Sequence, residues 1–377
     1  MIYLDNAATG GFKPVSVIEN TCYTIKYLNA NAGRSGHRLS KTGAELVYNA
    51  RKTLANFFNN NCPERVIFTK NCTEALNVAI LGMIKKGEHV ITSIFEHNSV
   101  LRPLNYLKEQ GFITLTIISP KNNRFLTPFD IENHLTKNTS TAVLNYVSNV
   151  TGAINEIPKI GELLRENNIK FIVDGAQACG HFKIDILNDK INALAVAGHK
   201  GLNGILGSGA LIFDENTIIE NVFSGGTGTE TFNLLQPEFY PEKLEAGTLN
   251  LPAICSLYEG VLSLEDNIAS VGKQLKTLSK FLIDALTLND KVKVYSYPNE
   301  AGVVSFEING ISSMEVAEIL SNDFDIAVRG GFHCAPLIHK FLNTNENGLV
   351  RASISTNNTT YELKILIEAI SFIAKNL

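Results

Sequence analysis

One lysine stands at the end of an apolar segment, where a buried positive charge is costly. The sequence GHKG at 198–201 directly follows the apolar run ALAVA. A lysine at the end of a buried strand needs either a charged partner or a chemical role. Partial desolvation favours the uncharged amine, which is the nucleophile that condenses with aldehydes. Lys200 is therefore the first candidate for covalent chemistry with a carbonyl compound.

Polar residues follow several other apolar runs in the same way. Backbone N–H groups and a hydroxyl at the start of a helix, as after VIFT, can seat a phosphate group. Taken alone, each of these positions also fits an ordinary helix cap, a turn or a structural histidine. The residues concerned are Cys72 and Thr73 after VIFT, His97 after HVITS, Asn149 after TAVLNYV, and Asp174 and Gln177 at the end of KFIVD.

The apolar runs themselves predict the element that brings these residues together. Short runs without alternation indicate strands covered on both faces, and amphipathic stretches between them indicate helices. This β-α rhythm predicts a mainly parallel sheet wrapped by helices. The predicted strands are 66–69, 89–93, 113–118, 141–147, 170–174 and 193–198, with helices near 73–86, 99–110 and 158–168.

Ligands of such sheets bind beyond the carboxyl ends of the strands, where the polar residues would meet. A phosphate seat, a ring to stack on, a carboxylate and a lysine form a set that suits pyridoxal 5′-phosphate (PLP). The carboxylate would hold the pyridinium nitrogen and the lysine would bind the aldehyde. The residues therefore favour a PLP enzyme.

The length of 377 residues exceeds what one hydrophobic core usually serves, so two domains are expected. Besides a helix at 41–58, the C-terminal part predicts a different architecture. We expect a long helical stretch at 252–288, strands at 302–307 and 349–355, and helices near 313–321 and 360–375. With the boundary after Asn250, the large domain would cover 13–250. The small α+β domain would cover 1–12 and 251–377.

Composition excludes several classes of partner. The net charge is −4, the apolar fraction is 45%, and no run of basic residues indicates a nucleic-acid or membrane surface. The first residues do not resemble a signal peptide, and no apolar run approaches the ~20 residues that cross a bilayer. We therefore expect a cytoplasmic protein that acts on a small molecule or another protein.

The six cysteines are scattered without a C-x-x-C pair, so neither a disulfide framework nor a zinc site is expected. No other metal site is expected. Four of the cysteines fit a structural role as small buried side chains. They are Cys22, Cys62, Cys179 and Cys255.

A series of motifs, in order along nearly the whole chain, resembles the class V, fold-type I PLP enzymes and their cysteine desulfurase branch. The last motif resembles the short cysteine loop of group II (SUF-type) desulfurases. The resemblance implies a large domain with a mainly parallel seven-stranded sheet, and a smaller α+β C-terminal domain that carries the catalytic cysteine. The motifs are YLDNAAT (3–9), TEALN (73–77), EHNS (96–99), SNVTG (148–152), VDGAQ (173–177), GHKG (198–201), EAGT (245–248) and RGGFHCA (329–335).

The resemblance implies a role for each residue around the cofactor ring. Lys200 would carry PLP as a Schiff base, and Asp174 would pair with the pyridinium nitrogen. Gln177 would donate a hydrogen bond to the ring phenolate oxygen. His97 would stack on the ring and move protons, and Asn149 would also contact the cofactor.

The resemblance also implies how the phosphate is held. Thr73 and His199 would bind it, with the backbone N–H groups of Cys72 and Thr73. Thr248 would reach the phosphate of the cofactor in a second subunit, so the resemblance implies a homodimer.

On the substrate side, Asn149 and Arg351 would hold the substrate, with Arg351 clamping its carboxylate in bidentate fashion. His37 would lie at the mouth of the site. Arg329 and His333 are two candidate sources of positive potential beside the substrate and Cys334, and the sequence does not rank them. Cys334 would accept the sulfur as a persulfide, for which it must be a thiolate.

The implied reaction converts L-cysteine to L-alanine, after which a small sulfur-acceptor protein collects the persulfide. The sequence leaves three destinations open for the sulfur, namely iron–sulfur cluster assembly, thiolated tRNA or a cofactor. A selenocysteine lyase and a class V aminotransferase or epimerase are alternatives with the same cofactor. A sulfur-relay scaffold subunit is the alternative without catalysis, and the lysine at position 200 argues against it.

Overall fold

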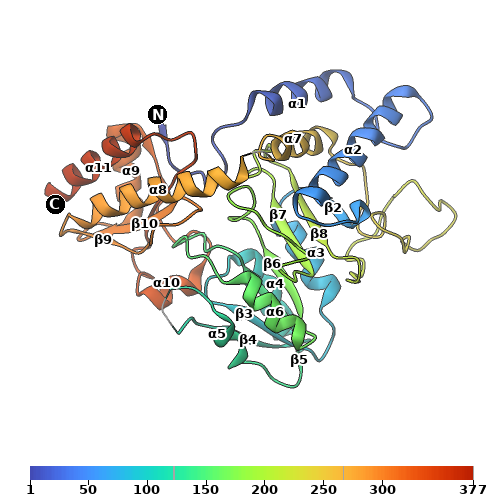
Figure 1. The fold of residues 1–377 in the computed structure, drawn as a ribbon, viewed down its shortest axis with the longest axis horizontal. Helices are drawn as coiled ribbons and strands as arrows, with labels where there is room; N and C mark the ends of the chain where they lie inside the picture. Colours follow the sequence, from blue (N-terminus) through green and yellow to red (C-terminus); the bar gives the residue numbers. More distant parts are fainter. Residues whose placement is uncertain (122–123, 266, 377) are drawn as a thin grey trace.

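The computed structural model describes residues 1–121, 124–265 and 267–376, and a seven-stranded sheet forms the centre of its larger part (Figure 1). Strand β8 is antiparallel to both of its neighbours, and the other neighbouring strands are parallel. This confirms the predicted α/β fold with a mainly parallel sheet. In spatial order the strands are β2 (Val66–Thr69), β8 (Gly209–Phe213), β7 (Ala193–Ala197), β6 (Lys170–Asp174), β5 (Thr139–Asn145), β3 (His89–Ser93) and β4 (Thr114–Ile118).

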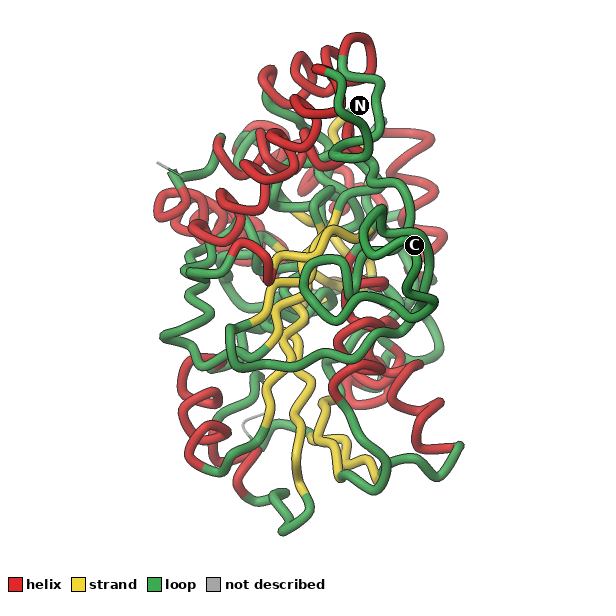
Figure 2. The backbone as a smooth tube through the Cα atoms, turned by 90° about the vertical axis from the view of Figure 1, so that its right-hand side faces the viewer, coloured by secondary structure: helices red, strands yellow, loops and turns green. Residues whose placement is uncertain are grey.

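Both faces of this sheet are covered, which explains why its strands are apolar without alternation. In β6, Phe171 and Val173 belong to one buried core, whereas Ile172 between them belongs to a second core. Figure 2 shows helices on either side of the strands. Alternate side chains of one strand therefore pack into different layers, and both layers require apolar residues.

The helices of the larger part position the ends of the strands. Helix α3 packs against β6, β7 and β8, while α1 and α2 pack against α7. The start of α3 therefore lies at the carboxyl ends of the parallel strands. These helices are α1 (Val15–Tyr27), α2 (Arg38–Phe57), α3 (Cys72–Met83), α4 (Asn98–Glu109), α5 (Pro128–Glu132), α6 (Ile157–Glu166) and α7 (Leu251–Leu262).

The C-terminal part forms a smaller α+β unit around a core of its own. Its antiparallel sheet has the order β12 (Val350–Ser353), β10 (Val303–Ile308), β9 (Val292–Val294), and β1 (Ile2–Tyr3) pairs in parallel with β11 (Ile326–Ala327). The domain division after Asn250 stays a prediction. The helices are α8 (Ile268–Thr287), α9 (Ser313–Phe324), α10 (Pro336–Leu342) and α11 (Thr360–Lys375).

The expectation of one long helical stretch at 252–288 is wrong. Helix α7 ends with Ser263 as its C-cap, and α8 begins after Asn267 as its N-cap. Serine and asparagine favour helix ends because their side chains compete for backbone hydrogen bonds. The two helices also pack against different elements. Helix α7 packs on α1 and α2, whereas α8 packs on β9, β10 and α11. The elements that were not predicted are helices α1, α5 and α10 and strands β1, β8, β9 and β11.

The described ranges contain neither a candidate membrane span nor a candidate metal cluster. No helix within them combines the length and apolar character needed to cross a bilayer. Nor do they contain a cluster of three or more histidine, cysteine or acidic side chains arranged to hold a metal ion.

Candidate active site

A cavity of about 220 Å³ lies at the carboxyl ends of the parallel strands. Most of the residues singled out in the sequence line it together, although they come from distant segments. His37, Thr248 and Cys334 are not among the lining residues. The predicted residues that line the cavity are Cys72, Thr73, His97, Asn149, Asp174, Gln177, His199, Lys200, Arg329 and Arg351.

Lys200 and Asp174 extend from neighbouring parallel strands into this cavity. Asp174 ends β6 and pairs in register with Ala195 of β7, the strand that leads to Lys200. Desolvation lowers the pKa of Lys200, which favours the free amine, although the charge of Asp174 opposes that shift. Among the described residues, the Lys200 amine has no hydrogen-bond partner. The lysine is therefore available as a nucleophile.

The start of α3 provides the anion seat that the sequence indicated. Asn71 caps the helix, and its side chain accepts a hydrogen bond from Glu74 N at 2.9 Å. The N–H groups of Cys72 and Thr73 lie in the first turn, where a helix offers no internal acceptor. Cys72 and Thr73 line the cavity at the positive end of the helix dipole, an arrangement suited to a phosphate.

His199 lines the same cavity as the start of α3. Its carbonyl oxygen accepts hydrogen bonds from Gly10 N at 2.9 Å and from Lys13 Nζ at 3.0 Å. Desolvation, with the nearby charges of Lys200 and Lys13, lowers the pKa of His199 to about 4. The imidazole is neutral at neutral pH, and its buried Nδ1 has no partner among the described residues. A buried ring nitrogen of this kind fits a hydrogen bond to a bound group.

His97 is held by its own helix. It caps α4, and its Nδ1 accepts a hydrogen bond from Ser99 N at 3.1 Å. Desolvation is the main cause that lowers the pKa of His97 to about 4. Since Nδ1 accepts, the neutral ring carries its proton on Nε2. A neutral ring fixed at a helix start is suited to stacking on a planar ligand.

Glu96 was quoted within a motif but was given no role from the sequence. Its side chain is fully buried, and Oε1 accepts hydrogen bonds from Ser93 Oγ at 2.5 Å and Asn145 N at 3.0 Å. Oε2 has no partner among the described residues. Burial raises the pKa of Glu96 to about 8. The carboxyl is therefore neutral at neutral pH, directly before His97.

We expect Glu96→Gln to raise the melting temperature, relative to the parent protein, more at pH 8 than at pH 5. The folded pKa of about 8 lies above the value of about 4.3 in an unfolded chain. The stability from the protonated form is thus fully present below about pH 4 and is lost as the pH rises toward 8, at about 1.4 kcal/mol per unit. Glutamine resembles the protonated carboxyl but does not ionise.

Thermal unfolding of both proteins at the two pH values checks this expectation. The exposed Glu109→Gln is the matched control and should show no such pH-dependent difference. A Glu96→Gln effect of the same size at pH 5 and pH 8 would contradict the assignment of a protonated Glu96.

Two hydrogen bonds within the protein hold the side chain of Arg351. It lies on β12 and is only 1% exposed. One terminal nitrogen donates to the carbonyl oxygen of Asn149 at 3.0 Å, and the other donates to Asp5 Oδ1 at 2.9 Å. The buried Nε has no partner among the described residues. A substrate carboxylate would thus meet a guanidinium that Asp5 already partly neutralises, an ion pair that was not predicted from the sequence.

The loop that carries Cys334 is fixed to the larger part by backbone carbonyl groups. His333 and Cys334 both have positive φ, 49° and 57°, which is uncommon for such residues. The carbonyl oxygen of Cys334 accepts from Asn98 N at 2.7 Å, and that of His333 accepts from Asn149 Nδ2 at 2.7 Å. These bonds hold the loop in its unusual backbone conformation.

The thiol of Cys334 is exposed, and Cys334 directly follows His333, which lines the cavity. Arg329, which lines the cavity, places one guanidinium nitrogen 3.8 Å from the Cys334 sulfur. A nearby cation stabilises the thiolate, which is the nucleophilic form of cysteine. His333 does not add to this positive potential, because burial lowers the pKa of its ring and keeps it neutral. Of the two predicted sources of charge, Arg329 is the one in place.

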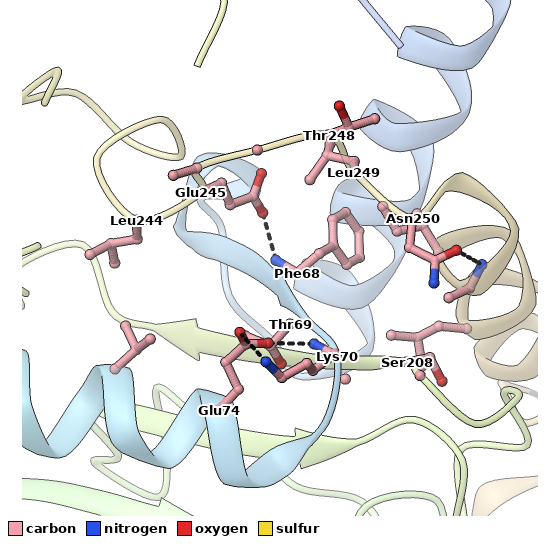
Figure 3. Close-up of a pocket in the computed structure, with 18 of the residues that line it drawn as sticks. Phe68, Thr69, Lys70, Glu74, Ser208, Leu244, Glu245, Thr248, Leu249 and Asn250 are labelled. Atoms are coloured by element: carbon pink, nitrogen blue, oxygen red, sulfur yellow. Dashed lines mark hydrogen bonds and ion pairs between the residues drawn. The ribbon is translucent and has the colours of Figure 1, made fainter. Parts of the chain in front are cut away.

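Thr248 lies in a second pocket, on the segment 244–250 (Figure 3). Glu245 fixes this segment, because its Oε1 accepts from Phe68 N at 2.6 Å and from Arg51 at 2.9 Å. In Figure 3 the Thr248 hydroxyl points away from the strand that carries Thr69. Within one chain, Thr248 does not reach the cavity of Lys200.

His37 lies outside the cavity as well. It caps α2, with its Nδ1 accepting from Ser40 N at 3.3 Å, and its side chain is exposed. His37 does not line the Lys200 cavity, and its contact with the substrate stays a prediction.

Comparison with known proteins places this geometry in a family. Residues 2–366 match the aminotransferase class-V family. A probable cysteine desulfurase of Pyrococcus abyssi is 33% identical, over 100% of this chain and 95% of the relative. One of Methanothermobacter thermautotrophicus is 31% identical, over 99% and 94%. The apo structure of a cysteine desulfurase from Thermococcus onnurineus is 32% identical, covers 100% of this chain and 95% of that one, and superposes with a TM-score of 0.93.

Proposed function

Because this chain belongs to the class V aminotransferases and, among them, to the cysteine desulfurases, we propose that its cavity removes sulfur from L-cysteine with PLP bound to Lys200. Cys334 is the proposed sulfur acceptor, and alanine is the other product. The observation that carries the proposal is the cavity that Lys200, Asp174 and His97 line together, with Cys334 beside Arg329, which also lines it.

The donors and acceptors in the cavity fit PLP. The N–H groups at the start of α3 and the neutral ring of His199 suit the phosphate. Asp174 accepts two hydrogen bonds on Oδ1, whereas Oδ2 has no partner among the described residues. A carboxylate oxygen left open in the cavity suits a pyridinium N–H. The Lys200 amine suits the aldehyde, and His97 suits the face of the ring.

When bound, PLP supplies a conjugated ring that takes up electron density from the substrate α-carbon. Arg351 and Asn149 orient the substrate by its carboxylate end. The lowered pKa of Lys200 would leave its amine free to hold the cofactor aldehyde and to take the proton from the substrate Cα. His97 stays neutral beside them and excludes water from one side of the site.

Cys334 acts on the sulfur of the substrate. Its thiolate forms a bond to that sulfur while the carbon–sulfur bond breaks, and the electron pair stays with the carbon skeleton. The skeleton takes up a proton and leaves as alanine, so Cys334 retains the sulfur as a persulfide. Arg329 stabilises the thiolate before the attack.

The function is tested by incubating the purified protein, supplied with PLP, with L-cysteine and a thiol reductant. We expect alanine and sulfide in equal amounts. A protein that binds PLP but forms no alanine from L-cysteine would overturn the proposal. L-Serine, which lacks the sulfur, is the control substrate and should give no alanine.

We also propose a small sulfur-acceptor protein as a partner. The carbonyl groups of His333 and Cys334 are fixed to the larger part, so the loop is not free to carry sulfur away. The exposed thiol must instead be approached by another molecule. This agrees with the predicted short loop of the SUF-type desulfurases, a subgroup that stays a prediction. Alanine formation that no acceptor protein or reductant accelerates would contradict this step.

We propose a homodimer because a second copy would explain the position of Thr248 and would cover an exposed apolar loop. Thr248 is exposed and does not line the Lys200 cavity. Phe232, Leu234 and Leu235 are 99%, 98% and 79% exposed, on a loop that extends from the body of the molecule (yellow in Figure 1). Apolar side chains exposed together mark an interface. A second copy would cover them and receive Thr248 at its phosphate seat.

We expect Leu234→Asp to weaken the dimer by roughly tenfold or more, because a leucine buried at an interface contributes about 1.5–3 kcal/mol and a charge there is unfavourable. Light scattering over a dilution series measures the dissociation constant. The control is Leu288→Asp, a leucine 85% exposed at the end of α8. Equal dissociation constants for the two variants would rule out the loop as an interface.

A further inference from the structure

The thiol of Cys72 lies against the carboxylate proposed to hold the pyridinium nitrogen. Its sulfur is 3.4 Å from Oδ1 of Asp174, and the side chain is buried. The backbone N–H of Ala176 donates to the same oxygen at 2.9 Å. The role expected for Cys72 was that of a backbone N–H in the phosphate seat. Its side chain therefore makes a contact that the phosphate seat does not explain.

Cys72 is a hydrogen-bond donor in this contact. Burial, with the charge of Asp174, raises its pKa well above the usual range of a thiol. The sulfur therefore keeps its proton, and the carboxylate oxygen accepts. Oδ1 thus has two donors from two directions, while Oδ2 remains without a partner among the described residues.

We infer that Cys72 is a positioning residue, whose thiol orients the Asp174 carboxylate so that Oδ2 stays open to the ring nitrogen of PLP. The inference rests on the proposed function, since it requires PLP in this cavity. A carboxylate on a single bond to Cβ can rotate. The Ala176 N–H fixes one oxygen from the backbone, and the thiol adds a second anchor from α3, the helix that also forms the phosphate seat.

The hydrogen bond to Asp174 also gives Cys72 a role different from that of Cys334. A thiol that keeps its proton is a poor nucleophile, whereas Cys334 lies beside the guanidinium of Arg329. Cys72 therefore does not compete for the substrate sulfur, although it lines the cavity.

The test is the affinity of the apo-protein for PLP, measured by titration together with the visible absorption band of the bound cofactor. We expect Cys72→Ala to bind PLP about tenfold more weakly and to shift the band, because a hydrogen bond to a charged group is lost. Cys72→Ser keeps a donor and should restore affinity to within about twofold. Cys72→Val keeps the volume without a donor and should resemble Cys72→Ala.

Cys179→Ala is the matched control, since Cys179 is equally buried near Asp174 but its thiol is not one of the hydrogen-bond donors to that carboxylate. It should bind PLP as the parent does. Cys72→Ala and Cys72→Val with parental affinity and absorption would overturn the inference, as would Cys72→Ser as weak as the alanine variant. Should the alanine variant not fold, the serine and valine variants decide. A parent protein that binds no PLP would instead overturn the proposed function.

Discussion

Lys200→Ala is expected to abolish the visible absorption of bound PLP and to reduce alanine formation from L-cysteine by at least about 10³-fold. The lysine performs two tasks in this account, as the amine that holds the aldehyde and as the base near the substrate Cα. Desolvation in the cavity lowers its pKa, which supports both tasks. Absorption spectra after PLP addition and an alanine assay measure the two losses separately.

Lys183→Ala serves as the control, because Lys183 is an exposed lysine outside the cavity lining. It should retain the absorption band and the activity. If Lys200→Ala kept both, the cavity would not be the site of the cofactor. If it lost only activity, a different amine would hold the aldehyde.

Cys334→Ser is expected to lower alanine formation from L-cysteine by at least about a hundredfold while the absorption band of PLP remains. The serine hydroxyl is a far weaker nucleophile than a thiolate. Cys334 does not line the cofactor cavity, so PLP binding should be unchanged. The alanine assay and the PLP titration measure the two effects on the same preparation.

Cys22→Ser is the matched control, since Cys22 is the other exposed cysteine in the described part of the chain. This variant should be as active as the parent. Full activity of Cys334→Ser would exclude Cys334 as the acceptor and would favour chemistry that needs no enzyme thiol, such as that of a selenocysteine lyase.

Residues at the carboxyl ends of strands could be predicted from the sequence. The ends of β6 and β7 are marked by a change from apolar to polar residues, and their parallel pairing brings Asp174 and Lys200 together. Thr73 was predictable for a related reason, because a helix that follows a strand starts at the same edge. These positions depend on the local pattern and on one rule of sheet topology.

Contacts between segments far apart in the chain could not be predicted. The ion pair of Asp5 with Arg351 joins positions that are 346 residues apart. The hydrogen bond from Asn98 N to the carbonyl oxygen of Cys334 joins a helix start to a distant loop. Every residue except proline has a backbone N–H group, so the residue type at position 98 does not indicate this bond. Neither the hydrophobic pattern nor the composition of the sequence therefore indicates that Asn98 holds the Cys334 loop.

The burial of Glu96 could not be predicted from the sequence for a different reason. Its place in a strand-to-helix turn suggests exposure, yet the turn packs under β5 and the side chain is fully buried. Its protonation follows from that burial, which the local sequence does not encode. The role of Thr248 depends on a second chain, and that of His37 stays a prediction. The single chain leaves both outside the cavity.

In the proposed reaction, sulfur from L-cysteine moves to Cys334 while PLP is held in the Lys200 cavity. Mass spectrometry can detect this sulfur on the PLP-loaded protein after reaction with L-cysteine in the absence of reductant, followed by digestion. We expect the peptide containing Cys334 to gain the mass of one sulfur atom, and the peptides containing the other five cysteines to gain none. Added sulfur on a different cysteine, or alanine formed with no sulfur added to the protein, would contradict it.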